Sequence, residues 1–430
     1  MSENLIKQVK DIIDSAKPYL STSRGRVILR DKRGLEYLDL VKDMIVNYYI
    51  GDSRLYEVNE WISKFKSLLI DSIKLINGRG WSLPREFKSF IEDPRVHLRK
   101  KLFNYTFDLV RGKLSFEDYI EKSRQAVTTS FNTNIRSLYQ YWILLGVIYN
   151  LGLEGAHLVY PEHGYIMLDR SGRQKTGSIP PNIILKINGR GELSFFIEAP
   201  RPLGWEDTRD LSRVWKLYVI FRPDILVYSG RVLDIVDLRG DIPVIRPDII
   251  IECKEQPDWY IRSRYLKGPI AKPLTAEEWM SRWLKGLWEG LGEALGVSRE
   301  KLGEFIEERR GSIKVKELDL ITFYKETYKP KLFILISKPK IDEAIKKTLQ
   351  SRNIVVIDNV EIGDIGRLRE VSKIIKEYAK PVSEDIIDTI RVLISLKLNE
   401  NINRDIVERA LLKLASSRIE ELVDIILEER

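Results

Sequence analysis

Apolar residues recur every three or four positions through the first 130 residues, and glycines separate the periodic segments. This spacing predicts a series of amphipathic helices. The predicted helices are Leu5–Lys17, Leu35–Tyr49, Leu55–Ile76, Val96–Arg111 and Phe116–Thr129. A further helix over Asn132–Asn150 is apolar almost all round, so we expect it to be buried. The stretch from Gly78 to Pro84 is expected to be an exposed loop.

The period of the pattern then changes from helical to alternating, which predicts strands. The predicted strands are Tyr165–Leu168, Asn182–Ile187, Leu193–Ile197, Asp224–Tyr228, Val232–Asp237 and Asp248–Lys254. Asn188-Gly189 is expected in the turn of a hairpin. Helices are expected over Asp207–Lys216 and after a capping box at Thr275–Glu278. A strand–helix–strand unit follows over Leu332–Ser337, Ile341–Gln350 and Ile354–Ile357.

The remainder of the chain, from about Ile365 to Arg430, has a helical pattern. We therefore predict an α/β protein in which helices flank a mixed sheet. Three domains are expected: a helical N-terminal domain over residues 1–130, an α/β core over 131–360 and a helical region over 361–430.

One apolar strand ends in a group of charges. Asp248-Ile-Ile-Ile is followed directly by Glu252-Cys-Lys-Glu. Side chains two apart on a strand point to the same face, so Glu252 and Lys254 are expected side by side. Cys253 should point the other way and be buried, which speaks against a nucleophilic role. The plainer interpretation is that Glu252 and Lys254 form a surface salt bridge on an edge strand. However, this strand is too apolar to lie at the edge of a sheet.

A second carboxylate is needed if this strand end binds a metal. Asp224 opens an earlier apolar strand and could supply it, since two carboxylates suit a hard divalent cation. Asp248 is the alternative, but four residues along a strand place it about 13 Å from Glu252. With Lys254 beside them, these groups suit metal-assisted phosphodiester hydrolysis.

These residues resemble a known signature. Pro223-Asp224 followed after 28 residues (252 − 224) by Glu252-Cys253-Lys254 is similar to the motif of the PD-(D/E)xK nuclease superfamily. The resemblance covers roughly residues 130–360 and extends to the nuclease part of modification-dependent restriction systems. It implies a restriction-endonuclease-like core, with Mg²⁺ or Mn²⁺ held by Asp224, Glu252 and the Cys253 carbonyl, and a catalytic Lys254.

The chain departs from this family on the first core helix, where many members carry a glutamate. The corresponding position here is Gln140, which brings no charge and would weaken metal binding. Glu154 and Glu198 are the alternative acids, and Glu198 ends a predicted strand of the same sheet.

Basic and aromatic residues interleave directly after the motif, over Trp259–Lys267. Arg262, Arg264 and Lys267 are therefore candidates for phosphate contacts. A packed loop with solvated charges is the alternative. Three later tryptophans, Trp279, Trp283 and Trp288, are most simply core residues. The chain has no Gly-Lys-Ser/Thr phosphate loop, which speaks against ATP hydrolysis.

The composition of the chain indicates the kind of partner and the cellular environment to expect. The formal net charge is +8, which is consistent with a polyanionic partner. Much Ile, Lys, Arg and Glu with little Gln, Cys, Met or His is usual in hyperthermophiles. One cysteine excludes an internal disulfide framework and fits a reducing cytoplasm. No apolar run resembles a signal peptide or a membrane span, so a cytoplasmic protein is expected.

The resulting hypothesis is a cytoplasmic, metal-dependent nuclease that acts on DNA in defence or DNA processing. Its helical ends would grip nucleic acid, form a homodimer or recruit a partner subunit. One alternative is a catalytically degenerate nuclease fold that serves as a nucleic-acid-binding or scaffold subunit. A second alternative is an interaction protein whose helices bind other proteins.

Overall fold

The computed structural model describes residues 2–23, 26–168, 178–199, 222–237, 242, 244–265 and 314–380. The chain divides into two compact units. Unit 1 comprises Met1–Ser67 and Leu83–Trp142, and unit 2 comprises Leu68–Ser82 and Ile143–Arg430. Two long helices, α3 (Asp52–Leu75) and α6 (Phe116–Leu153), contribute residues to both. The expected domain boundaries near residues 130 and 360 stay a prediction.

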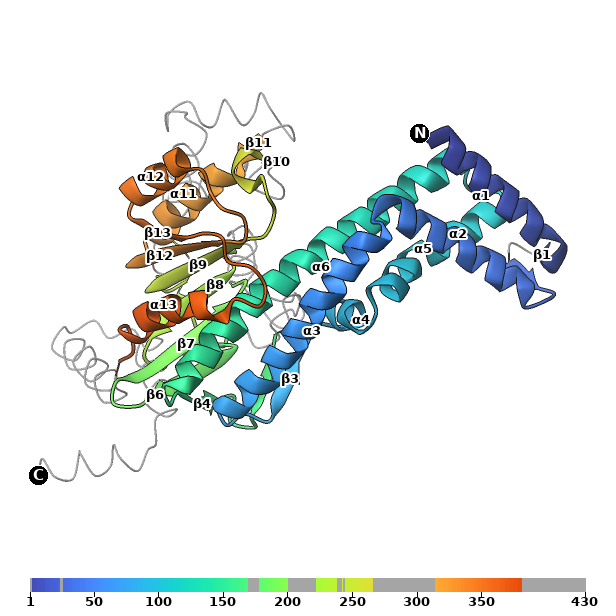
Figure 1. The fold of residues 1–430 in the computed structure, drawn as a ribbon. Coiled ribbons are helices and arrows are strands. Elements are labelled where there is room, and N and C mark those ends of the chain that lie inside the picture. The colour runs from blue at the N-terminus through green and yellow to red at the C-terminus, as the bar shows by residue number, and fades with distance from the viewer. Residues whose placement is uncertain are drawn as a thin grey trace, which may run out of the picture. The chain divides into compact units, whose positions relative to one another are not determined.

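Unit 1 is built mainly from helices, as its periodicity predicts (Figure 1). Besides α3 and α6 it contains α1 (Ser2–Ala16), η1 (Lys17–Tyr19), β1 (Leu20–Ser23), β2 (Arg26–Leu29), α2 (Arg33–Tyr49), α4 (Arg85–Glu92) and α5 (Pro94–Val110). The short hairpin β1–β2 and helix α4 were not predicted.

The prediction of two helices over residues 116–150 was wrong, because α6 runs unbroken through both. The polar stretch near residue 130 suggested a break. In the structure its side chains bond to carbonyls one turn back, Asn134 to Ser130 at 2.8 Å and Ser137 to Thr133 at 2.8 Å. Such local bonds satisfy polar side chains without ending the helix.

The core of unit 1 includes a buried histidine. His97 lies 3.1 Å from the Ser130 hydroxyl and contacts the edge of Phe90. Burial lowers the pKa of His97 to about 4, and the nearby Lys101 acts in the same direction. The imidazole is therefore neutral at pH 7 and serves as a polar core group.

Unit 2 is built on a seven-stranded mixed sheet in the order β13-β12-β9-β8-β7-β6-β4. The strands are β4 (His157–Tyr160), β6 (Ile183–Ile187), β7 (Gly191–Ile197), β8 (Ile225–Ser229), β9 (Ile249–Lys254), β12 (Leu332–Ser337) and β13 (Ile354–Ile357). From β4 to β9 neighbours run antiparallel, whereas β9, β12 and β13 are parallel. Most of these strands match the predicted ones, which confirms the α/β class.

Some predicted local structure was wrong. Within the described residues, Val232–Asp237 forms an isolated bridge, Val236 with Val244, and no strand. The Asp234 side chain accepts hydrogen bonds from the backbone N–H groups of Ile179 and Val236. The loop expected at Gly78–Pro84 contains β3 (Gly80–Ser82), which pairs in parallel with β5 (Tyr165–Met167). A third pair, β10 (Ser263–Tyr265) with β11 (Lys314–Lys316), was also not predicted.

Helices cover both faces of the large sheet (Figure 1). On one face, Phe196, Leu226, Ile250 and Phe333 share a core with apolar residues of α11 (Glu317–Tyr328) and α12 (Glu343–Ser351). The other face is covered by α13 (Ile365–Lys376) and the end of α6.

The helices α6 and α13 are in direct contact. Asn150 donates to the Ile365 carbonyl at 3.3 Å and Ser372 to the Val147 carbonyl at 3.2 Å. Gly146 of α6 lies against Leu368 of α13, so the close approach depends on the missing side chain.

Several predicted elements lie outside the described residues. These are the helix over Asp207–Lys216, the helix from Thr275 with its tryptophans, and the helical tail beyond Lys380. The beginning of the predicted helical tail is confirmed, because α13 spans Ile365–Lys376. Among the described helices, none combines the length and apolarity that crossing a membrane requires.

Candidate active site

Two carboxylates face each other where β8 begins and β9 ends. These strands are antiparallel with Ile225 opposite Ile251, so Asp224 stands opposite Glu252. Directly opposed residues project to the same face of a sheet. Asp224 accepts a 2.7 Å hydrogen bond from the Cys253 backbone N–H, and Glu252 accepts a 3.3 Å bond from the Asp224 N–H. These bonds fix the orientation of both carboxylates. Both residues are buried, Asp224 with 8% and Glu252 with 3% of its surface exposed.

Lys254 completes the cluster on the same face. Its Nζ donates to Glu252 Oε1 at 3.0 Å and to Glu317 Oε2 at 3.0 Å. Glu317 is the first residue of α11, the helix that covers this face of the sheet. The ammonium also lies 5.9 Å from the centre of the Trp259 ring. Trp259 is itself held by a 3.1 Å bond to Ser337 of β12.

The electrostatics of the cluster are dominated by surplus negative charge. Burial and the neighbouring Glu252 raise the pKa of Asp224 well above its usual range. Burial opposes the charge on Lys254, but Glu252, Glu317 and Asp224 outweigh it and raise the pKa of the lysine. Lys254 is therefore a permanent cation near neutral pH, and Asp224 binds a proton more readily than a free aspartate does.

Glu198 adds a third acid from the next strand. It follows β7, donates its backbone N–H to the Asp224 carbonyl at 2.8 Å and has a φ of 44°. Its charge contributes to raising the pKa of Asp224. Acids from three neighbouring strands, β7, β8 and β9, thus influence one another.

The other candidate acids are engaged elsewhere. Glu154 forms an ion pair with Lys376 of α13. Asp248, at the opposite end of β9, accepts a bond from the Ser229 backbone at 2.7 Å and pairs with Lys331 at 2.6 Å. Asp248 therefore secures the β8–β9 connection, in line with its expected distance from Glu252.

The remaining site predictions have different outcomes. Cys253 is buried, and burial raises the pKa of its thiol well above the usual value, which opposes a thiolate nucleophile. Gln140 is buried in α6 but belongs to unit 1, whereas the charged cluster belongs to unit 2. Its role at the site stays a prediction.

The predicted phosphate-binding residues follow the cluster in the chain. Arg262 is exposed directly after the short helix η3 (Trp259–Ile261) and lies 3.6 Å from Asp258. Arg264 lies in β10 opposite Val315. Lys267 is outside the described residues. Their contact with substrate stays a prediction.

Sequence reasoning missed Glu317. An acidic residue in the first turn of a helix is common because it complements the helix dipole, so its type gave no sign of a site. Only the packing of α11 on the sheet brings it to Lys254. Trp259 was noted as part of a basic and aromatic segment, but its place beside Lys254 also follows from the fold.

The donor set fits a hard divalent cation. Asp224, Glu252 and Glu198 offer carboxylate oxygens, which Mg²⁺ and Mn²⁺ prefer. Burial first, and then the neighbouring acids, raise the pKa of Asp224, and a cation among these carboxylates would offset both effects. Across the described residues, no three acids, histidines or cysteines already stand in the geometry of a metal site.

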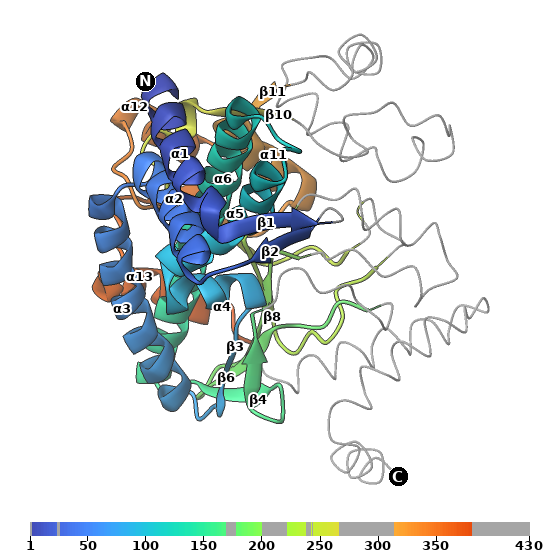
Figure 2. The same ribbon diagram turned by 90° about the vertical axis from the view of Figure 1, so that its right-hand side faces the viewer.

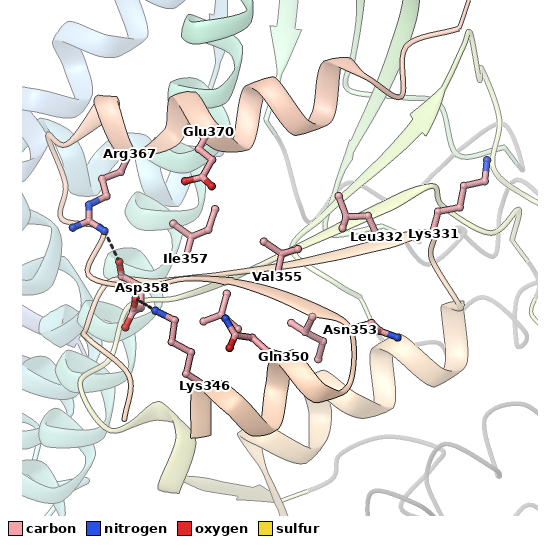
Figure 3. A pocket seen from close by; sticks show the side chains of 12 residues that line it. Lys331, Leu332, Lys346, Gln350, Asn353, Val355, Ile357, Asp358, Arg367 and Glu370 are labelled. Atoms are coloured by element: carbon pink, nitrogen blue, oxygen red, sulfur yellow. Dashed lines mark hydrogen bonds and ion pairs between the residues drawn. The ribbon is translucent and has the colours of Figure 1, made fainter. Parts of the chain in front are cut away.

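A separate groove of about 770 Å³ runs along β13 between α12 and α13 (Figure 3). Its cations are already paired, since Lys346 bonds Asp358 at 3.1 Å and Lys331 bonds Asp248 at 2.6 Å. We assign no ligand to this groove.

No protein-family model, curated protein or solved structure matches this chain. The superfamily resemblance therefore rests on the motif residues, and a proposal about function rests on the chemistry of the charged cluster.

Proposed function

We propose that this protein is a metal-dependent nuclease with a restriction-endonuclease-like core in unit 2. The observation that carries the proposal is the pairing of Asp224 with Glu252 across β8 and β9, with Lys254 bonded to Glu252 on the same face. Buried like charges beside a lysine destabilise a fold and are usual at catalytic sites. The net charge of +8 is consistent with DNA as substrate.

Each residue has a distinct role in the proposed reaction. Asp224 and Glu252 would hold the cation, with the Cys253 carbonyl as a third ligand and Glu198 as a further acid. A bound Mg²⁺ or Mn²⁺ supplies activated water and charge neutralisation at the phosphate. The Lys254 ammonium orients the water and stabilises negative charge that develops on the phosphate oxygens. Its two carboxylate contacts keep it charged and fixed in place.

The proposal is tested by metal-dependent cleavage. Linear, circular and single-stranded DNA are incubated at high temperature with Mg²⁺, Mn²⁺ or EDTA. Wild-type protein should cleave only with a metal, and Lys254→Ala should lower the rate by about 10²–10³-fold, the scale for one preorganised electrostatic group. Glu252→Gln should lose activity through loss of the metal, whereas Asp248→Asn should change it little.

Lys346→Ala is the matched control, because Lys346 is also partly buried and paired with a carboxylate. It should cleave like the wild type. Equal activity in Lys254→Ala and wild type would refute the assigned site.

A catalytically degenerate nuclease fold is the second candidate. It is favoured by the closure of the cluster, since Asp224, Glu252 and Lys254 are all less than 10% exposed and bonded to one another or to the backbone. Gln140 in place of an acid points the same way. DNA binding without cleavage under any metal would support this candidate over the enzyme.

A further inference from the structure

One short segment of unit 1 is strongly basic. Residues 17–33 contain six lysines and arginines and one aspartate, a net charge of +5 out of +8 for the whole protein. The segment includes the hairpin β1–β2, which lies far from the nuclease motif in the sequence and was not part of any predicted site.

The register of the hairpin gives it two different faces. Leu20 pairs with Leu29, and these leucines pack over the start of α2, where a Cβ on Gly34 would stand 2.7 Å from Leu20. The alternate pairs are Ser21 with Ile28 and Ser23 with Arg26, and they project from the opposite face. This outer face thus presents two hydroxyls, a guanidinium and Ile28, which is 48% exposed.

Two further cations follow the hairpin. Arg30 and Lys32 are exposed, as is Arg26. Within the part of the chain that the structure describes, none of these three side chains forms an ion pair or hydrogen bond. Arg33 differs, because it bonds Asp31 at 2.9 Å and lies over the Tyr19 ring. Asp31 is thereby neutralised within the segment and leaves the other three charges uncompensated.

We propose that the β1–β2 hairpin, with Arg26, Arg30 and Lys32, is a contact surface for the phosphate backbone of duplex DNA. Uncompensated arginine and lysine beside serine hydroxyls suit phosphate oxygens. A two-stranded ribbon also fits the major groove of B-DNA, which is about 12 Å wide. The inference deepens the proposed function by naming duplex DNA as the substrate class, but binding here needs no metal and no cleavage.

The test measures binding to a labelled duplex of about 25 base pairs in the presence of EDTA. Fluorescence anisotropy gives the binding constant at salt concentrations between about 50 and 200 mM. The variant Arg26→Ala/Arg30→Ala/Lys32→Ala removes the three charges. Each phosphate contact contributes about 0.9 to the slope of log K against log salt. If each of the three side chains contacts one phosphate, the magnitude of the slope should therefore decrease by about 2.7. Affinity at low salt should fall at the same time.

The matched control is Lys66→Ala/Lys113→Ala/Lys122→Ala, which removes three exposed lysines from the same unit. It should keep nearly the wild-type slope. Equal loss in both triple variants, an unchanged slope in the hairpin variant, or binding of anionic vesicles but not duplex DNA would overturn the proposal. Because the assay contains EDTA, inactivity as a nuclease would not affect its outcome. Thermal melting of both variants shows whether the fold is kept.

Discussion

At the residue scale, the protonation state of Lys254 depends on the carboxylates that surround it. Lys254 is buried, and a buried ammonium without partners would lose its proton. Glu252 and Glu317, each 3.0 Å from the ammonium, reverse that tendency. The reversal matters for the proposed reaction, since only the charged form of Lys254 can stabilise a phosphate.

In the proposed reaction, Glu317 would position Lys254, and this role has a specific signature. In Glu317→Gln the pKa of Lys254 should be lower, because one of the carboxylates that raise it is gone. Activity should then fall at a lower pH on the alkaline side of the rate profile, while the acidic side stays in place.

The matched control is Asp319→Asn, which removes a charge from the same helix at a residue whose pKa is raised chiefly by its own burial. Its alkaline limb should coincide with the wild type. An alkaline limb that does not move in Glu317→Gln would contradict the role of this residue.

At the element scale, the contact between α6 and α13 depends on one missing side chain. An alanine Cβ at Gly146 would stand 2.3 Å from Leu368 Cδ1, and Leu368 is fully buried. Gly146→Ala should therefore cost about 1–3 kcal/mol through overpacking, less the roughly 1 kcal/mol by which alanine is favoured over glycine in a helix interior. Chemical denaturation followed by circular dichroism measures the change.

Gly366, in the first turn of α13, is the matched control because a Cβ there meets only Asp364 at 3.6 Å. Gly366→Ala should be neutral or stabilising by up to about 1 kcal/mol, since alanine favours helix. Two alanines with equal effects would show that the α6–α13 packing is looser than the structure indicates.

The same scale shows what sequence patterns can and cannot predict. Strong periodicity placed α2, α3 and α5 and both parallel strands after residue 330 within a few residues of their observed ends. It failed for the expected strand at 232–237, where the Asp234 side chain accepts hydrogen bonds from backbone N–H groups. It also missed the short elements β1, β2, β3 and α4, whose stability comes from packing.

The candidate site, like the fold, could be predicted only in part from the sequence. Glu252 and Lys254 follow from alternation along one strand, and Asp224 was chosen over Asp248 by a distance argument that the structure supports. Glu317 could not be chosen, because it joins the cluster through a helix packed on the sheet. Local pattern determines the strand, while tertiary contacts determine its partners.

At the scale of the whole molecule, Asp224 links stability to pH and, under the proposed function, to metal. Its carboxyl has a raised pKa in the folded state, so the folded protein retains this proton to higher pH than the unfolded chain does. The free energy of unfolding should therefore fall as pH rises from about 4 through the raised pKa. Below that window both states are protonated and the penalty disappears.

Asp224→Asn should accordingly raise the Tm of the metal-free protein at pH 8, by roughly 1 °C for each kcal/mol relieved in a chain of 430 residues. The gain should vanish near pH 3.5. Mg²⁺ or Mn²⁺ should raise the wild-type Tm at pH 8 and leave the variant nearly unchanged. A less stable variant at pH 8 without metal would contradict a raised pKa of Asp224 in the folded protein.

The packing of α13 against α6 also has a consequence during synthesis. The bond from Ser372 to Val147 joins residues 225 positions apart, and the pair of Lys376 with Glu154 joins residues 222 apart. At ribosomal rates of about 5–20 residues per second, roughly 10–45 s pass between translation of the two partners. Throughout that interval the buried surface of α6 that α13 covers lacks its native partner. Apolar surface exposed in this way favours aggregation, so α6 should be most prone to it in the nascent chain before α13 emerges.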